Sequence, residues 1–116
     1  MSRDWLLYVD DLIASAEKIG RLTLGRDLAA LRNDEAAFDA VLFNLQVIGE
    51  AIKQLPAEQL ALLPEEHRRG PARLRDLIAH HYFSVEPSLI FDAATRHVPA
   101  LLNDAAEGTE GIDGIT

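Results

Sequence analysis

The sequence predicts an all-α fold, an antiparallel four-helix bundle with an extra short helix, from three features of its 116 residues. Apolar residues recur at helical spacing almost throughout the chain. No segment alternates apolar and polar residues for long enough to indicate a half-buried strand. Proline and glycine fall between the periodic segments, and the short connections that result favour antiparallel packing of neighbouring helices.

The first two long helices are expected from Arg3 to Ile19 and from Asp34 to just before Pro56. Ser2 can cap the first helix, and Gly20 is expected to end it. Asp34 can cap the second helix, and Pro56 ends it because proline disfavours helical geometry in the residue before it. The expected buried stripes are Trp5, Val9, Leu12, Ile13 and Ala16 in the first helix and Phe38, Val41, Leu42, Leu45, Ile48 and Ile52 in the second.

The connections and the later helices follow from the remaining prolines and glycines. Residues 21–33 form a linker with room for one short helical turn, and a short helix is expected near residues 58–63. Pro71 suits the first position of a third main helix that runs to about Phe83. A last helix is expected over residues 87–103, with a kink at Pro99.

Residues 1–103 are therefore predicted to form one domain, and residues 104–116 a disordered acidic tail. The tail is rich in glycine, has no basic residue and contains four of the 19 acidic residues. A chain of this length is large enough to bury a single core.

Composition excludes several classes of protein. The absence of cysteine rules out disulfides, zinc–thiolate sites and a cysteine nucleophile. The formal net charge of −8 argues against a general binder of nucleic acids, since phosphate affinity comes mainly from Lys and Arg. The charged N-terminus does not resemble a signal peptide, and no apolar run is long enough to cross a membrane. We therefore expect a cytoplasmic chain without a membrane partner.

Common sequence signatures for metals and nucleotides are also lacking. The chain has no glycine-rich phosphate loop, no H-E-x-x-H and no Glu-x-x-His pair. No metal site and no cofactor are expected.

Positive charge gathers in one segment of this acidic chain. Four of the 11 Lys and Arg residues and three of the four histidines lie between residues 67 and 81, namely Arg68, Arg69, Arg73, Arg75, His67, His80 and His81. A small positive cleft for a single phosphate is compatible with an acidic protein, even though broad affinity for phosphates is not.

A helical wheel of the third main helix separates two faces. Leu74, Leu77 and Ile78 form the predicted core stripe, with His81 at its edge. The opposite face mixes charged, aromatic and small side chains, which favours close packing of a second helix over open solvent. We therefore predict a homodimer packed across this helix, from Arg75 to Phe83, around a two-fold axis.

Asp76 and His80 are four residues apart, so the carboxylate can hold one imidazole nitrogen and leave the other for proton transfer. Arg75 diverges from His80 within one chain, but two copies can converge across a dimer. Guanidinium groups would then hold a phosphate while histidines move protons, as metal-independent RNA cleavage requires. The alternative for His80 is a surface or interface histidine. His67 and His97 are given no role.

The segment from Arg75 to Tyr82 resembles the R-x4-H-x-Y signature of the HepT-like ribonuclease toxins, within the HEPN superfamily of small helical domains. Three further segments agree with this family, and the resemblance spans about residues 4–102. They are Asp4-Trp5 with Tyr8, Ile48-Gly49-Glu50-Ala51, and Tyr82-Phe83-Ser84-Val85-Glu86.

The resemblance implies an RNA-cleaving toxin of a type II or type VII-like toxin–antitoxin pair. It implies a homodimer with Arg75 and His80 as catalytic residues at its interface, and a small nucleotidyltransferase as antitoxin. The spacing to His80 adds Asp76 as a supporting residue. It also implies that Tyr82 is the residue this partner adenylylates, and the bulky anionic adduct would repel RNA. The alternative for Tyr82 is an interface ring with a satisfied hydroxyl group.

Two departures from the family pattern leave other functions open. Asp76 stands where family members often have Asn, and the chain has His67-Arg68-Arg69-Gly70-Pro71 where they often have a Trp. The extra negative charge near the phosphate can lower activity. A catalytically silent helical partner of a nucleotidyltransferase is therefore the second hypothesis, and a plain dimeric bundle is the third. Glu50 is interpreted as a structural helix residue.

Overall fold

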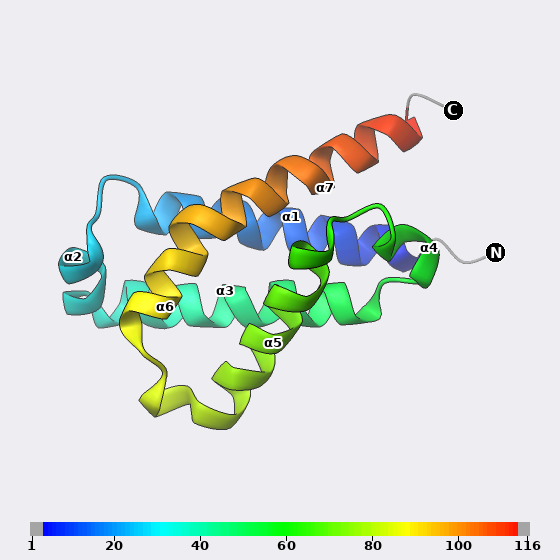
Figure 1. The fold of residues 1–116 in the computed structure, drawn as a ribbon. Coiled ribbons are helices and arrows are strands. Elements are labelled where there is room, and N and C mark those ends of the chain that lie inside the picture. The colour runs from blue at the N-terminus through cyan, green and yellow to red at the C-terminus, as the bar shows by residue number, and fades with distance from the viewer. Residues whose placement is uncertain (1–3, 114–116) are drawn as a thin grey trace.

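The computed structural model describes the backbone of residues 4–113 and the side chains of residues 4–105 (Figure 1). Every regular element in this range is helical, which confirms the predicted all-α fold. The elements are α1 (Asp4–Thr23), α2 (Leu28–Asn33), α3 (Glu35–Gln54), α4 (Ala57–Leu60), α5 (Glu65–His81), the 3-10 turn η1 (Tyr82–Ser84), α6 (Pro87–Asp92), the π-helical segment η2 (Ala93–His97) and α7 (Val98–Asp113).

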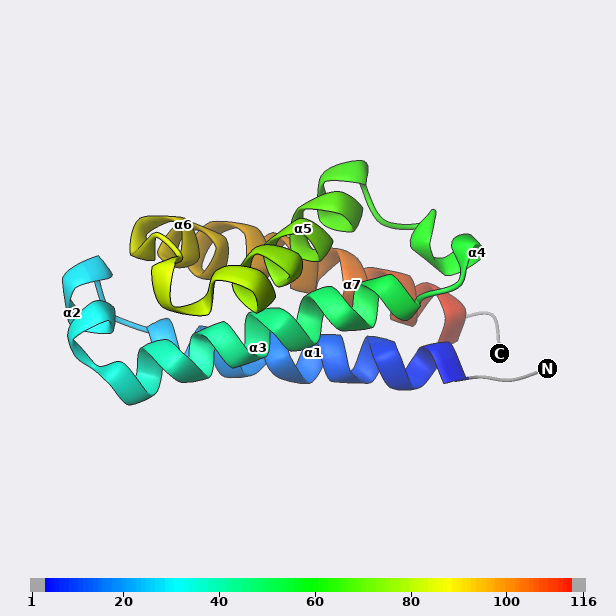
Figure 2. The ribbon, with the colours of Figure 1, turned by 90° about the horizontal axis from the view of Figure 1, so that it is seen from below.

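The long helices pack in two layers. α1 and α3 lie side by side and antiparallel, and α5 and the continuous helix α6–η2–α7 cover one side of this pair (Figures 1 and 2). α3 contacts both α1 and α5, so it links the two layers. Burial of each large side chain contributes roughly 1.5–3 kcal/mol. The most completely buried side chains are Leu12, Ile19, Leu31, Val41, Ile48, Ile52, Ile78, Ile90 and Leu101.

α3 begins and ends where the sequence predicts. The Asp34 side chain caps the helix by accepting a hydrogen bond from the Ala37 amide at 3.1 Å, and it also accepts one from Arg26 at 2.9 Å. The Ala37 hydrogen bond is the larger cause, and the Arg26 guanidinium a smaller one, of the lowered pKa of Asp34. The helix ends at Gln54, shortly before Pro56.

α1 continues past Gly20, so the prediction that this glycine ends the helix is wrong. Gly20 is exposed, and one glycine inside a helix costs only about 1 kcal/mol. Ile19 and Thr23 are buried, and the Thr23 hydroxyl donates to the Ile19 carbonyl at 2.8 Å. The reversal instead comes at Gly25, whose φ of 71° favours glycine. The predicted cap Ser2 lies outside the described residues.

α5 begins at Glu65, so Pro71 lies inside the helix and not at its first position. Proline removes one helical hydrogen bond there, the one to the His67 carbonyl. A tertiary contact stabilises the turn before it, because His67 is buried and its Nδ1 lies 2.7 Å from Oδ2 of Asp104 in α7. His67 therefore makes a structural contact.

The last helical segment is interrupted before Pro99 by the π-helical turn of η2. The Thr95 hydroxyl donates to the Phe91 carbonyl at 2.7 Å within the interrupted region. α7 then extends to Asp113, so the predicted domain boundary after Asn103 falls within this helix. Disorder of the tail stays a prediction, and residues 114–116 lie outside the part of the chain described.

The short segments differ little from expectation. α2 occupies the second half of the predicted linker, and α4 is a single turn within a few residues of the predicted short helix. Among the described residues, no helix is long and apolar enough to span a membrane.

Replacing Gly20 with alanine is expected to stabilise the protein by about 0.5–1 kcal/mol, because the added Cβ meets open space and restricts the unfolded chain. Urea unfolding followed by circular dichroism measures the change. Gly25→Ala serves as the opposite control, since its positive φ makes the same substitution unfavourable. A loss of stability in Gly20→Ala would contradict a helix that continues through residue 20.

Candidate active site

The predicted site residues lie in the second half of α5 and in the turn that follows it. α5 crosses α3, and its last turns extend beyond that helix (Figure 1). Ile78 is fully buried, whereas His80 and His81 are exposed. The prediction that His81 lies at the core edge is therefore wrong, because the helix has passed the neighbours that would cover this position.

Gly49 lets α3 and α5 approach closely next to Arg75. A Cβ built on Gly49 would lie 2.5 Å from the Pro71 carbonyl oxygen and closer still to Arg75 Cβ. Only a residue without a side chain fits this contact. Gly49 interrupts the apolar stripe of α3 and thus allows α5 to pack closely against α3. Arg75 lies at this helix crossing.

The Arg75 guanidinium group lies between two carboxylates. Its Nε is 3.3 Å from Oε2 of Glu50 in α3, and its Nη1 donates to Oδ1 of Asp76 at 3.3 Å. The side chain is about one-third exposed, at 34%. A guanidinium group has five N–H donors, so others remain for the oxygens of a phosphate.

Asp76 pairs with Lys53 of α3 and not with His80 as the spacing suggested. Its Oδ1 accepts a hydrogen bond from Lys53 Nζ at 2.6 Å. This bond, with a smaller contribution from Arg75, holds the pKa of Asp76 below its usual value. Spacing along one helix could not reveal a cation supplied by another helix, and this cation offsets the negative charge that Asp76 adds.

His80 is exposed and, among the side chains described, makes no hydrogen bond or ion pair. Both ring nitrogens are therefore accessible to a ligand. An imidazole side chain can act as a general acid or base.

Tyr82 is partly buried, and its hydroxyl group donates to Oδ1 of Asp39 in α3 at 3.4 Å. Burial and the nearby Asp39 carboxylate both disfavour the phenolate, and they raise the pKa of Tyr82 above 10.0. Phe83 contacts the Tyr82 ring edge-to-face, with centroids 5.2 Å apart, and is itself 99% exposed.

The remaining histidines lie away from this site. His67 is buried in contact with α7, and the Nε2 of exposed His97 lies 3.2 Å from Oδ2 of Asp92. Within residues 4–105, no group of three or more His, Asp and Glu side chains is arranged to hold a metal ion.

Four residues of α3 shape the site and were not among the predicted site residues: Asp39, Gly49, Glu50 and Lys53. The interpretation of Glu50 as purely structural is incomplete, because its carboxylate holds Arg75. The Ile48-Gly49-Glu50-Ala51 segment and the break in the apolar stripe at Gly49 were the available signals. No sequence signal indicated Lys53 or Asp39, because their partners Asp76 and Tyr82 are distant in sequence.

Gly49→Ala is expected to destabilise the protein by about 1–3 kcal/mol, because the new Cβ overlaps the backbone and the Arg75 side chain of α5. Urea unfolding measures the loss, and Gly20→Ala is the matched control with the opposite expected sign. A Gly49→Ala variant as stable as the wild type would contradict the close crossing of α3 and α5.

Tyr82 is expected to ionise above pH 10.0, and Asp39→Asn is expected to lower that pKa toward 10.0 by removing the charge and the carboxylate acceptor. Ultraviolet absorbance of phenolate in a Tyr8→Phe background isolates this residue. Since folding raises the pKa, the corresponding stability is present below pH 10 and is lost as the pH rises through the folded-state pKa. A midpoint at or below 10.0 would contradict the contact.

Comparison with known proteins places this site in a family. The ribonuclease HepT-like family matches residues 12–107, a range that includes Arg75, His80 and Tyr82. A candidate RNase of Methanocaldococcus jannaschii is 30% identical over 112 residues, which cover 97% of this chain and 93% of that protein. A probable ribonuclease HepT of Thermococcus cleftensis is 31% identical over 101 residues, which cover 87% of this chain and 92% of that protein.

A longer relative carries the same region beside another activity. It is a gamma-glutamylcyclotransferase and candidate RNase of M. jannaschii, 27% identical over 117 residues, and the match covers 97% of this chain but 51% of the relative. No solved structure gives a significant match. The family match covers most of the chain and includes the whole R-x4-H-x-Y segment, so the chain belongs to the HepT-like ribonuclease family.

Proposed function

We propose that the chain is a metal-independent endoribonuclease that acts as the toxin of a toxin–antitoxin pair. The observation that supports this proposal is an accessible, unpartnered His80 five residues after Arg75 in α5, together with the contact of the Arg75 guanidinium group with Glu50 of α3. One group can move a proton and the other can bind a phosphate oxygen.

The proposed active form is a homodimer that packs across the end of α5. Phe83 is almost completely exposed, and Leu77 beside the site is 37% exposed. Large apolar side chains at the end of one helix favour burial against a second copy. A two-fold axis at this end would bring Arg75 and His80 of both chains into one cleft.

In the proposed reaction, one histidine takes the proton of the RNA 2′-hydroxyl group, and the oxygen attacks the adjacent phosphorus. A protonated histidine gives a proton to the leaving 5′-oxygen, while Arg75 stabilises the charge on the phosphoryl oxygens. The products are a 2′,3′-cyclic phosphate and a 5′-hydroxyl group.

Tyr82 is the proposed site of control by a small nucleotidyltransferase antitoxin. Its hydroxyl group lies on the same end of α5 as His80 and hydrogen-bonds only to Asp39 among the side chains described. An adenylate on this oxygen would add bulk and negative charge where RNA has to bind.

A catalytically silent partner of a nucleotidyltransferase is the alternative function. The observation that favours it is that Glu50 and Asp76 already occupy part of the Arg75 guanidinium group. Binding of a phosphate would then compete with two carboxylates.

Purified protein is expected to cut a 5′-labelled RNA into fragments with 2′,3′-cyclic phosphate ends. His80→Ala and Arg75→Ala are each expected to lower kcat/KM by about 100-fold or more, because each removes a group that acts in the transition state. Arg32→Ala is the control, since Arg32 is an exposed arginine of α2 without an ion pair among the described residues. Light scattering of the same sample measures the dimer.

Intact RNA after incubation with purified dimer, together with a His80→Ala variant that changes only the affinity for the nucleotidyltransferase, would favour the silent partner. A monomer at micromolar concentration would contradict the shared cleft. Growth arrest on expression in a bacterial host, relieved by co-expression of the nucleotidyltransferase, tests the toxin role.

A further inference from the structure

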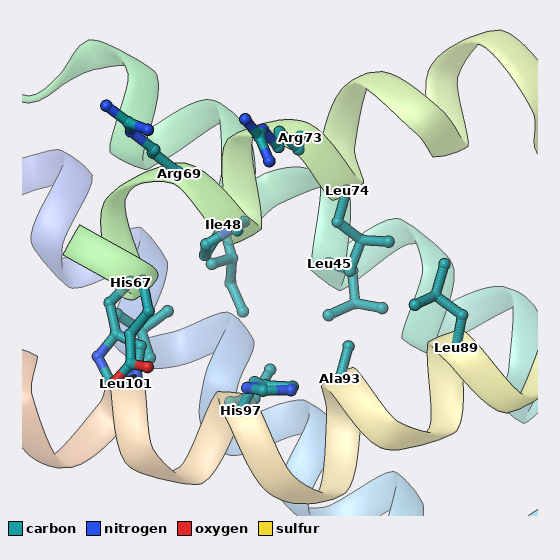
Figure 3. Close-up of a pocket in the computed structure, with 14 residues that line it drawn as sticks. Leu45, Ile48, His67, Arg69, Arg73, Leu74, Leu89, Ala93, His97 and Leu101 are labelled. Atoms are coloured by element: carbon teal, nitrogen blue, oxygen red, sulfur yellow. Dashed lines mark ion pairs between the residues drawn. The ribbon is translucent and has the colours of Figure 1, made fainter. Parts of the chain in front are cut away.

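A cavity of about 410 Å³ lies between α3, α5 and the helix α6–η2–α7 (Figure 3). Figure 3 shows Leu45 of α3, Leu74 of α5 and Ala93 of η2 around its interior. Its volume falls in the range of pockets that bind small organic molecules. None of the groups assigned above to catalysis or regulation lines it.

Arginine, histidine and one glutamate, Glu66, line this cavity. Arg69 and Arg73 line one wall from α5, and His97 lines the wall opposite (Figure 3). Arg69 pairs with Glu65 at 3.1 Å, but Arg73 is exposed and has no acidic partner among the side chains described. An uncompensated guanidinium group at the mouth of an apolar cavity suits a ligand with an apolar flat body and a negative charge.

A nucleotide has this combination of properties. An unstacked base can enter an apolar slot, its phosphate can bind arginine, and its edge can bind Nδ1 of His97, whose Nε2 contacts Asp92. Single-stranded RNA is recognised in this way, by insertion of splayed bases and by contacts of the backbone with cations.

The position of the cavity along α5 connects it with the cleavage site. His80 follows Arg73 by seven residues, which is close to two helical turns, so both side chains leave the same side of the helix. The corresponding rise is roughly 10 Å. A short stretch of single-stranded RNA can span this length, with one nucleotide at Arg73 and the scissile phosphate near His80.

We propose that this cavity is a subsite for the base of a nucleotide that flanks the scissile phosphate, with Arg73 as the residue that binds the backbone of that nucleotide. The subsite rests on the proposed ribonuclease function. It gives the enzyme a preference for the identity of one base outside the cleaved bond.

Two variants test the subsite from different sides. Arg73→Ala removes the free cation, and Gly70→Leu places a side chain at the mouth of the cavity that Gly70 lines. A Cβ on Gly70 meets nothing within 4 Å, so Gly70→Ala is compatible with the fold and serves as the reference for Gly70→Leu. Arg32→Ala is the charge-matched control.

The binding probe is a fluorescein-labelled, 2′-O-methylated hexaribonucleotide that cannot be cleaved. Arg73→Ala and Gly70→Leu are each expected to weaken its binding about tenfold relative to Arg32→Ala and Gly70→Ala, as loss of one base contact does. The same variants are expected to lower kcat/KM for an unmodified hexanucleotide about tenfold more than for the dinucleotide at its cleavage site. They are also expected to flatten the base preference at one flanking position.

Unchanged hexanucleotide affinity and base preference in both variants would overturn the subsite while leaving the ribonuclease intact. If Gly70→Leu changes the oligomeric mass of the protein without changing RNA binding, the cavity binds a side chain of a second copy. This result would also overturn the subsite. The wild type could also bind free nucleoside monophosphates tightly, with Gly70→Leu alone abolishing that binding and leaving RNA binding unchanged. The cavity would then be a site for a free nucleotide, and the RNA subsite would be overturned. Failure of the wild type to cleave RNA, with variant-sensitive hexanucleotide binding, would overturn the proposed catalysis alone.

Discussion

The contact between α3 and α5 at Gly49 determines where most of the candidate site lies. Without a side chain at this position, the backbone of α5 approaches α3 closely enough for Glu50 and Lys53 to reach Arg75 and Asp76. The same approach buries Ile78 and directs the last turns of α5 past α3, where His80 stands free. A larger residue would push apart two backbones whose polar side chains interact over about 3 Å, and hydrogen bonds weaken steeply with such displacement.

Positive charge is concentrated in α5 although the net charge of the chain is negative. The chain carries −8 in total, yet α5 combines an arginine held by carboxylates, a free histidine and a free arginine on the cavity rim. Lys53 and Asp76 neutralise each other, and each is only partly buried, so solvent screens their contribution to stability. Asp76 also contacts the Arg75 guanidinium group at 3.3 Å. The acidity that argues against general nucleic-acid binding is compatible with one small site for a phosphate.

Much of the fold could be predicted from the sequence, because helix caps and apolar periodicity agree with the burial that the structure shows. Asp34 caps α3, and the apolar stripes of α1 and α3 are buried or partly buried. Predictions were wrong where a local signal competed with a tertiary contact. Gly20 is tolerated in α1 because residues on either side of it are buried, and Pro71 is tolerated in α5 because the buried His67 is joined to Asp104.

The sequence by itself determined the helical class, the R-x4-H-x-Y segment and the placement of Arg75, His80 and Tyr82 on one helical stretch, since these depend on periodicity and short spacing. Tertiary structure decided the partners of those residues. Asp76 binds Lys53 and not His80, Tyr82 donates to Asp39, and His81 faces solvent. The cavity beside Arg73 likewise exists only when three helices meet. The physical reason is that each of these depends on packing between helices, which brings together residues far apart in the chain.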